Sequence, residues 1–569
     1  MSAQPPPFPT QVDVVVAGGG PTGLFLATEL SHRGVSCVVL EPREELDWLH
    51  PRAKTTNART MTHLRRLGLA DALREAAPLT PQWSDHVAFC TSLVGRELTR
   101  FRHAFQLDAG RYGPQPECGQ QVAQPVVEQV LRAGLEASDA AHLALGVRLD
   151  RSTDLGADGV ETVAVDADGT EHRIRSRFLV GADGVGSTVR RGLGVRLEGG
   201  SAAKSNLGLL FRSARLAESV ALDPAVQYWV VGREYAGMVG PMDLDGLWWA
   251  IVQGYDPAAP QFAGVGPQEV LRSLVGADVD VELLAEDPWT ARMLLAPTYR
   301  VGNVLLAGDA AHANPPWGGH GFNTCVGDAA NLAWKLAGVV HGWAGPGLLD
   351  SYEPERRPVA RRTIAEAQRN GEVLADDLMD DDLDRPGAAG DAARARAAQA
   401  LAVKESEFHS LGLVLGYHYA GSPIVADELA DAPLEDPVRY EPSTAPGCLL
   451  PHHWIDASTS LYDVLGADFT VLLRAAPGAV THDDTAYVET GLVDAGLGVP
   501  VTVRTVPWSP ESAAWPDPWL LVRPDQHVAW RGSSLAGLVG ALRRAVGRAA
   551  GAPDDLTAPC TARTTRSSS

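Results

Sequence analysis

The chain has 569 residues, with 48 Lys and Arg against 70 Asp and Glu, so its formal net charge is −22. Hydrophobic residues make up 45%, ordinary for a globular protein, and at roughly 150 residues per domain the length predicts three or four domains. The acidic excess argues against nucleic-acid and anionic-membrane partners, no apolar run reaches the roughly 18 residues of a membrane helix, and MSAQPPPFPT is not a signal peptide.

A strand, a glycine-rich turn and a helix open the chain. The β-branched run at residues 12–17 (VDVVVA) predicts a buried parallel strand. A helix is predicted over residues 24–33, with Gly34 as its stop. A second strand, residues 35–40, ends at Glu41. These elements predict one complete β-α-β unit.

The turn carries the pattern GxGxxG at Gly18, Gly20 and Gly23. Such glycines permit a tight turn, close approach of backbone amides to a pyrophosphate, and packing of the helix on the strand. The phosphates then lie at a helix N-terminus, where free N–H groups favour negative charge. Glu41 closes the next strand, where an acidic residue hydrogen-bonds a ribose hydroxyl. The two flanking strands and this acid make the pattern specific.

The middle of the chain contains a predicted helix, a second glycine-bearing motif and a long segment of alternating sequence. Residues 122–137 predict a helix, and the segment 179–190 reads DGxxSxxR, beginning its motif at Asp183. From about 195 to 295, Trp and Tyr residues stand among alternating segments. This alternation predicts a largely antiparallel sheet that forms a separate lobe.

Two glycine-bearing motifs follow a strand at residues 303–307 (NVLLA). Asp309 stands at the end of this strand, where its carboxylate can accept hydrogen bonds from a polyol such as a ribityl chain. The loop 318–323 (GGHGFN) precedes a helix predicted over residues 324–341, and its amides could stabilise charge on a reduced flavin ring. A plain helix cap would explain either motif alone.

The last part of the chain predicts a connector, a small domain and a tail. Residues 376–391 form an acidic connector with Gly and Pro. Strands at 469–473 and 519–523 predict a small α/β domain, and the tail from 554 is expected to be disordered. The six cysteines form no CxxC, so structural zinc, a redox dithiol and a secreted disulfide scaffold are not expected. We expect a cytoplasmic enzyme with no metal site.

The order GGGPTG and Glu41, then DGxxS, then GDAAH and PPxGGxGxN resembles the single-component FAD-dependent aromatic hydroxylases, or class A flavoprotein monooxygenases. Members similar to phenol hydroxylase, with a thioredoxin-like C-terminal domain, look closest. The resemblance covers about residues 10–545. Further segments that carry it are 51–53 with 57–60, 124–128, 328–336 and 352–358.

The resemblance implies an α/β fold in three parts. These are a Rossmann-like FAD-binding domain, an inserted, mostly antiparallel β substrate domain, and a C-terminal thioredoxin-like α/β domain without CxxC. The expected boundaries are a disordered N-terminus (1–10), the FAD-binding domain (11–194 and 298–400, the latter with a long helix), the substrate-binding domain (195–297), a connector (401–447), the thioredoxin-like domain (448–550) and a disordered tail (551–569).

The resemblance also implies which residues hold FAD. Arg52 and Gln124 would reach the pyrophosphate or ribityl region, and Asp309 the ribityl hydroxyls. The amides of residues 321–323 would approach the flavin N1 and O2 side, and Asp183 would support its loop. The predicted cofactor-binding residues are Gly18, Gly20, Pro21, Thr22, Gly23, Glu41, Arg43, Arg52, Gln124, Asp183, Asp309, Pro316, Gly319, Gly321, Phe322 and Asn323.

The predicted catalytic residues are His320, Arg52 and Pro316, and the predicted substrate contacts are Trp317, Trp248 and Tyr235. His320 stands where relatives carry an uncharged residue, and an imidazole titrates near neutral pH. A loop histidine bonded to backbone is its alternative interpretation. For Trp248 and Tyr235 the alternative is a place in the core of the sheet.

The implied activity is hydroxylation of a phenolic or hydroxy-heteroaromatic small molecule with NADPH or NADH and O2, through a C4a-hydroperoxyflavin in a dry cavity. No second strand–GxGxxG–helix unit is found, and the family has no separate nicotinamide domain. Two alternatives stay open: Baeyer–Villiger oxidation or epoxidation of a polyketide-type substrate on the same scaffold, and a non-catalytic flavoprotein that docks through its last domain. A homo-oligomer also stays open.

Overall fold

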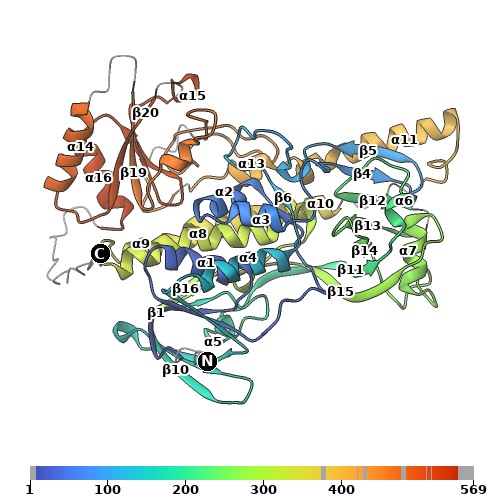
Figure 1. Cartoon of the computed structure of the whole chain (residues 1–569), viewed down its shortest axis with the longest axis horizontal. Coiled ribbons are helices and arrows are strands. Elements are labelled where there is room, and N and C mark those ends of the chain that lie inside the picture. The colour runs from blue at the N-terminus through green and yellow to red at the C-terminus, as the bar shows by residue number, and fades with distance from the viewer. Residues whose placement is uncertain are drawn as a thin grey trace, which may run out of the picture.

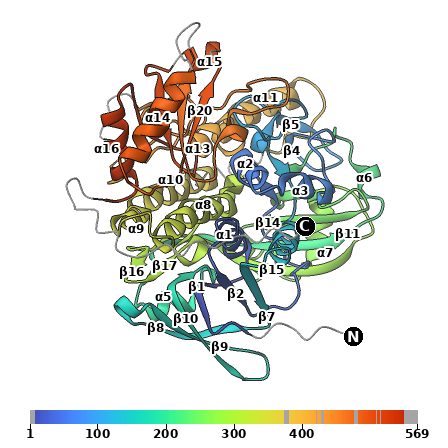
Figure 2. The same ribbon diagram turned by 60° about the vertical axis from the view of Figure 1, so that its left-hand side comes forward.

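The computed structural model places three large sheets around a set of packed helices (Figures 1 and 2). In both views the first sheet lies at the bottom, the second at the right and the third at the upper left. The expectations for residues 1–7, for the tail and for part of the acidic connector fall outside the described residues. The structure describes residues 8–232, 234–372, 378, 380–419, 421–426, 432–475, 482–507, 509–513 and 515–548.

The first sheet has the parallel centre that the opening of the chain predicts. Its order is β16-β17-β10-β1-β2-β7, and β1 pairs in parallel with both β10 and β2. Val14, Val15 and Val16 of β1 are fully buried, as expected for a strand covered on both faces. Its strands are β1 (Gln11–Ala17), β2 (Cys37–Glu41), β7 (Ala141–Leu145), β8 (Arg148–Asp154), β9 (Val160–Val165), β10 (Glu171–Gly181), β16 (Arg300–Val301) and β17 (Val304–Leu306).

Three helices pack together above this sheet, with α1 between α4 and α8. α1 (Pro21–His32) begins earlier than predicted because proline suits the first turn of a helix. α8 (His320–Val340) also begins earlier, directly after Gly319 at φ +66°. The other helices of this region are α2 (Ala58–Arg66), α3 (Ala70–Ala76), α4 (Gln124–Glu136), α5 (Thr188–Gly192), α9 (Gly347–Asp350) and α10 (Tyr352–Glu372).

The second sheet is antiparallel except where β12 meets β4. Residues 87–101, which precede the expected lobe, supply two of its strands. They join because β4 is fully buried and pairs with β12. In chain order the strands are β4 (Val87–Cys90), β5 (Glu97–Phe101), β11 (Glu198–Arg212), β12 (Gln227–Val231), β13 (Ala236–Pro241), β14 (Leu247–Gln253), β15 (Glu282–Leu295) and β18 (His312–Ala313), with helices α6 (Leu216–Ser219) and α7 (Pro267–Val275).

The third sheet has the order β20-β19-β21-β22, in which only β19 and β20 of the described strands run parallel. The helices that precede it in the chain are α11, α12 and α13, over residues 388–415. The remaining elements are the strands β19 (Phe469–Arg474), β20 (Val501–Val506), β21 (Trp519–Val522), β22 (Val528–Gly532), the two-stranded pair β3 (Thr55–Thr56) and β6 (Gln120–Gln121), and the helices α11 (Ala388–Leu401), α12 (Glu405–Phe408), α13 (Leu411–Leu415), α14 (His482–Asp494), α15 (Pro510–Ala513) and α16 (Leu535–Ala545).

No helix in the described part of the chain is both long and apolar enough to cross a membrane.

A buried ionic cluster fastens the third sheet to α8 and α10. The Glu355 carboxylate accepts hydrogen bonds from Lys335 Nζ at 2.6 Å and from both terminal nitrogens of Arg523, at 2.7 and 2.8 Å. The side chains of all three residues are fully buried. Burial alone would raise the pKa of Glu355, but Arg523 and Lys335 outweigh it and lower that pKa to about 2.

We predict that Glu355→Gln strongly destabilises the fold. Removing one partner of a buried ion pair leaves the other charge uncompensated, at a cost of about 3–5 kcal/mol, so the midpoint of chemical unfolding should fall.

The folded-state pKa lies below the ordinary carboxyl value of 4.5, so this stabilisation is present above about pH 4.5 and is lost as the pH falls toward 2. Arg215→Gln, which breaks an exposed 3.7 Å pair with Glu218, is the control and should leave the midpoint unchanged. An unchanged midpoint in Glu355→Gln would contradict the prediction.

Candidate functional site

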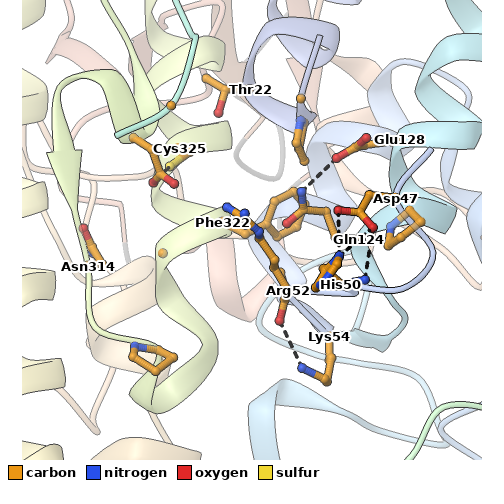
Figure 3. Close-up of a pocket in the computed structure, with 18 of the residues that line it drawn as sticks. Thr22, Asp47, His50, Arg52, Lys54, Gln124, Glu128, Asn314, Phe322 and Cys325 are labelled. Atoms are coloured by element: carbon orange, nitrogen blue, oxygen red, sulfur yellow. Dashed lines mark hydrogen bonds and ion pairs between the residues drawn. The ribbon is translucent and has the colours of Figure 1, made fainter. Parts of the chain in front are cut away.

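A cavity of about 700 Å³ lies where the carboxyl ends of β1 and β2 face the second sheet. Its volume falls in the roughly 300–1,000 Å³ range of small-molecule and cofactor sites. Figure 3 shows side chains of the segment 47–54 along one side of the cavity, and Asn314 and Cys325 along the opposite side. The wall therefore joins the predicted glycine turn to strands of the second sheet.

The glycine turn can hold its shape only with glycine. Gly18 has φ +104°, and a Cβ there would lie 2.4 Å from the carbonyl oxygen of Ala182. A Cβ on Gly23 would lie 1.9 Å from the carbonyl oxygen of Gly18. By contrast, a Cβ on Gly20 would meet no protein atom within 4 Å, because Gly20 borders the cavity.

The N-terminus of α1 meets the cavity without a side-chain cap. The free N–H groups and the dipole of this 12-residue helix favour an anion there. The open space beside Gly20 leaves room for a phosphate to approach. The turn therefore fits the pyrophosphate of a dinucleotide.

Glu41 shapes the same end of the cavity. Its Oε2 accepts the Gly19 N–H at 2.7 Å, and its Oε1 accepts the N–H and the Nε of Arg43 at 3.0 and 2.8 Å. Gln124 lies beside this pair and donates to Glu128 Oε1 at 2.8 Å (Figure 3). Oε2 accepts one hydrogen bond and keeps a lone pair, so the side chain can still accept a hydrogen bond from a ribose hydroxyl.

Asp183 caps a helix as well as lining the cavity. Its carboxylate accepts the Ser187 hydroxyl and the N–H groups of Thr188 and Val189, which begin α5. Arg190 follows and donates to the carbonyl oxygen of Ala310 at 3.0 Å. The DGxxSxxR segment thus holds the loop that carries Asp309.

A buried carboxylate fixes that loop from behind. Asp328 accepts the Gly308 N–H at 3.1 Å, contacts His312 Nε2 at 2.9 Å and accepts Arg356 Nε at 2.8 Å. Burial would lower the pKa of His312, but Asp328 outweighs burial and raises it. His312 is therefore part of the scaffold, while Asp309, which accepts the Cys325 thiol at 3.4 Å, lines the cavity.

The start of α8 presents two faces. Gly321, Phe322 and Cys325 line the cavity. His320 and residues 323, 324 and 327 line a second, smaller cavity behind it. The spacing i, i+3, i+4, i+7 puts the second group on the opposite face of the helix.

His320 is consequently placed away from the large cavity, which differs from its predicted catalytic position. Its imidazole is buried, and burial lowers its pKa to about 4, so it is neutral at physiological pH. Asn323 also faces away. Its Oδ1 accepts the Asn57 N–H at 2.9 Å and the Thr60 hydroxyl at 2.8 Å, which anchors α8 to the segment before α2.

The second sheet supplies an aromatic and apolar wall. Met238, Trp249 and Ile251 line the cavity, together with Trp317 from the loop before α8. Trp248 does not line it, because successive residues of β14 point to opposite faces.

Tyr235 also lies elsewhere, unlike its predicted place beside the substrate. Its ring stacks on Phe262 at 5.2 Å, and its hydroxyl donates to the carbonyl oxygen of Gln261 at 2.9 Å. Tyr235 and Trp248 belong to one packed core on the far face of the sheet. Both residues therefore fit the alternative interpretation, in which they fill the core of the sheet.

Most other predicted residues line the cavity. Of the predicted catalytic residues, Arg52 and Pro316 do so. Gly23 and Asn323 are the two predicted cofactor-binding residues that stand outside its wall. Those that line it are Gly18, Gly20, Pro21, Thr22, Glu41, Arg43, Arg52, Gln124, Asp183, Asp309, Pro316, Gly319, Gly321 and Phe322.

The sequence analysis did not assign five charged residues of the wall to the site: Asp47, Lys54, Glu128, Arg148 and Glu407. Lys54 directly follows the quoted segment 51–53, so its neighbours were a signal. Glu407 lies in the connector, where no motif marks it. Its carboxylate accepts the Gly318 N–H at 3.3 Å and Lys404 Nζ at 3.0 Å, and burial raises its pKa.

The cavity thus combines an anion-binding end with an aromatic end. Within the described residues no group of three or more His, Cys, Asp or Glu is arranged to hold a metal ion. The arrangement suits an organic cofactor with a phosphate-bearing tail and a planar head beside an aromatic substrate.

Comparisons with known proteins agree with this geometry. Residues 11–367 match a family model described as "FAD binding domain", and residues 443–553 match one described as "Aromatic-ring hydroxylase, C-terminal". The chain is 33% identical to 2,4-dichlorophenol 6-monooxygenase of Cupriavidus pinatubonensis, over 95% of this chain and 97% of that protein. It is 32% identical to aklavinone 12-hydroxylase RdmE of Streptomyces purpurascens, over 95% of this chain and 99% of that protein.

Solved structures are similar over the whole fold. The flavin-dependent monooxygenase PieE, in complex with FAD and substrate, has a TM-score of 0.84 and 28% identity, over 95% of this chain and all of that chain (100%). Aklavinone-11 hydroxylase, in a ternary complex with FAD and aklavinone, has a TM-score of 0.78 and 31% identity, over 94% of this chain and 99% of that chain.

We predict that Gly20→Val yields a folded protein that binds FAD at least about tenfold more weakly. The added side chain meets no protein atom at its Cβ but occupies the space that a phosphate needs. Flavin absorbance after gel filtration and titration of the FAD-free protein would measure the loss. Gly192→Ala is the control, because Gly192 also has open space but lies on α5 outside the cavity. Full retention of FAD by Gly20→Val would refute this use of the turn.

Proposed function

The chain belongs to the FAD-dependent aromatic-ring hydroxylases, and from that premise we propose that it hydroxylates a phenolic aromatic small molecule with NADPH or NADH and O2. One observation carries the proposal: a single cavity joins the uncapped N-terminus of α1 to a wall that contains Trp249 and Trp317. Relatives named for activity on dichlorophenol and on aklavinone support the phenolic class.

The three sheets support a division of labour. The first sheet, with the glycine turn after β1, serves as a Rossmann-like FAD-binding domain. The second serves as an inserted substrate-binding domain, because most of its residues lie between β10 and β17, which are neighbours in the first sheet. The third serves as a thioredoxin-like domain that packs rather than carries out redox chemistry, since its sequence has no CxxC.

Bound FAD supplies the redox chemistry, by accepting a hydride from NADPH or NADH and activating O2. The amides at the start of α1 would bind its pyrophosphate, and the Asp309 carboxylate would accept hydrogen bonds from its ribityl hydroxyls. The amides of Gly321 and Phe322 at the start of α8 would place positive partial charge beside the flavin N1 and O2 side. The presence of these residues in the cavity wall supports the roles.

The protein also prepares the aromatic end for oxygen transfer. Trp249, Trp317 and Met238 exclude water and hold a flat ring against the cofactor. The backbone from Pro316 to Gly319 forms an edge of the cavity and would border both ligands. Glu407 fixes this edge through the Gly318 N–H. Arg52, exposed at the opposite side, is free to contact an anionic part of the cofactor.

We expect phenols to stimulate reduction of the bound flavin by NADPH, and the product to gain one oxygen atom from O2. The purified holoenzyme is mixed anaerobically with NADPH and each member of a panel that runs from single-ring phenols to polycyclic hydroxyquinones. Products formed under isotopically labelled O2 are then identified by mass and NMR. A lactone or epoxide would favour the oxygen-insertion alternative. A flavin-loaded protein that no panel member stimulates would refute the proposed hydroxylation.

A further inference from the structure

Lys54 brings a charge into the aromatic end of the cavity. It immediately precedes β3 and lines the cavity wall (Figure 3). Its Nζ donates to the carbonyl oxygen of Arg52 at 3.1 Å and lies 4.6 Å from the centre of the Trp249 ring. An ammonium over an indole face is a favourable cation–π arrangement. Lys54 is thereby held against the second sheet, away from the glycine turn.

The charge of Lys54 is incompletely compensated by the protein. No carboxylate of the described residues lies within 4 Å of its Nζ. Burial lowers its pKa to about 8, against a weaker opposing effect of Asp287 on β15. Such a pKa means that the protein leaves the ammonium short of favourable partners. An anionic atom in the cavity would supply the missing partner.

The other charged groups near this end do not fill that role. Glu407, across the cavity on α12, already binds Lys404 and the Gly318 N–H. Arg52, on the same segment as Lys54, is itself a cation. The strand β14 faces Lys54 with Trp249, which carries no charge.

Unpartnered donors lie in the same wall. The indole nitrogens of Trp249 and Trp317 and the amide nitrogen of Asn314 are buried and have no hydrogen-bond partner among the described residues. Each of these groups is a donor only. The Trp249 indole nitrogen lies against Gly240 of β13, outside the cavity wall. For Trp317 and Asn314, a ligand with acceptor oxygens could supply the missing partner, whereas a ligand that presents only donors could not.

From these contacts we infer that Lys54 and Trp249 form the subsite for an ionised oxygen, a phenolate or a carboxylate, of the aromatic substrate. The inference rests on the proposed function and makes it more specific: the substrate carries an anionic group at the end of its ring system that faces β14. Lys54 is then a specificity-determining residue.

The test measures binding by calorimetry with the FAD-loaded protein, in the absence of NADPH. Three matched probes are used: a naphthoate, a naphthol and the neutral naphthamide. In Lys54→Met the naphthoate should bind about tenfold more weakly or worse, as expected when a hydrogen bond to a charged group is lost. The naphthamide should bind equally well to both proteins. Lys54→Arg should keep most of the affinity for naphthoate.

The pH dependence provides an independent readout. Because Lys54 loses its proton above about pH 8, naphthoate should bind the wild type less tightly as the pH rises from 7 to 9, with Lys54→Arg unaffected over that range. If the natural anion is a phenolate, the wild type should bind naphthol in its ionised form, which is visible in its ultraviolet spectrum. Selectivity for naphthoate alone assigns a carboxylate instead.

Three results would overturn the inference. The first is equal affinity of Lys54→Met and the wild type for both anionic probes, and the second is no binding of any probe to the flavin-loaded wild type. The third is loss of FAD affinity in Lys54→Met with probe binding intact. Arg212→Gln, an exposed cation on β11, controls for a change in overall charge. Failure of the proposed function would look different, since anion selectivity would persist while no oxygenated product formed.

Discussion

The buried carboxylate of Asp328 holds together the parts of the chain on which the cavity depends. Burial would raise its pKa, yet Arg356 and His312 outweigh burial and keep it ionised. One oxygen fixes the Gly308 amide and the other fixes Arg356 of α10. Arg356 in turn donates to the carbonyl oxygen of Thr324 on α8 at 3.2 Å. These contacts tie the Asp309 loop, α8 and α10 to one another, and they fix the amides of Gly321 and Phe322 relative to the Asp309 carboxylate.

The cavity wall carries charges of both signs, although the chain as a whole is strongly acidic, at −22. Its cations are Arg43, Arg52, Lys54 and Arg148, and its carboxylates are Glu41, Asp47, Glu128, Asp183, Asp309 and Glu407. Some of these charges are already used within the protein: Arg43 pairs with Glu41 and Glu128, and Asp183 caps α5. The binding of an anionic ligand therefore depends on where amides and cations lie in the wall, and the net charge of the chain does not decide it.

The sequence predicted those elements whose conformation depends on neighbouring residues in the chain. The GxGxxG turn needs its glycines where Gly18 has positive φ, and the apolar run of β1 needs two covered faces, so both could be read from sequence. Facing was harder. The alternation of β14 showed that Trp248 and Trp249 point apart but not which one meets the cavity, and a four-residue shift in the start of α8 turned His320 to the far side. Contacts between segments far apart in the sequence have no local signal. Neither the pairing of β4 with the second sheet nor the place of Glu407 in the cavity wall could be predicted.

The contact of Arg59 with the third sheet has a consequence for synthesis on the ribosome. Its buried guanidinium donates to the carbonyl oxygen of Asp525 at 2.7 Å, across 466 residues of chain. At about 5–20 residues per second, roughly 20 to 90 seconds pass between translation of the two. For about the first half of that interval the first sheet also lacks β17 (Val304–Leu306), which is translated after most of the inserted strands. The buried site of Arg59 can therefore be closed only after the C-terminal segment has been translated, and until then water must solvate the guanidinium.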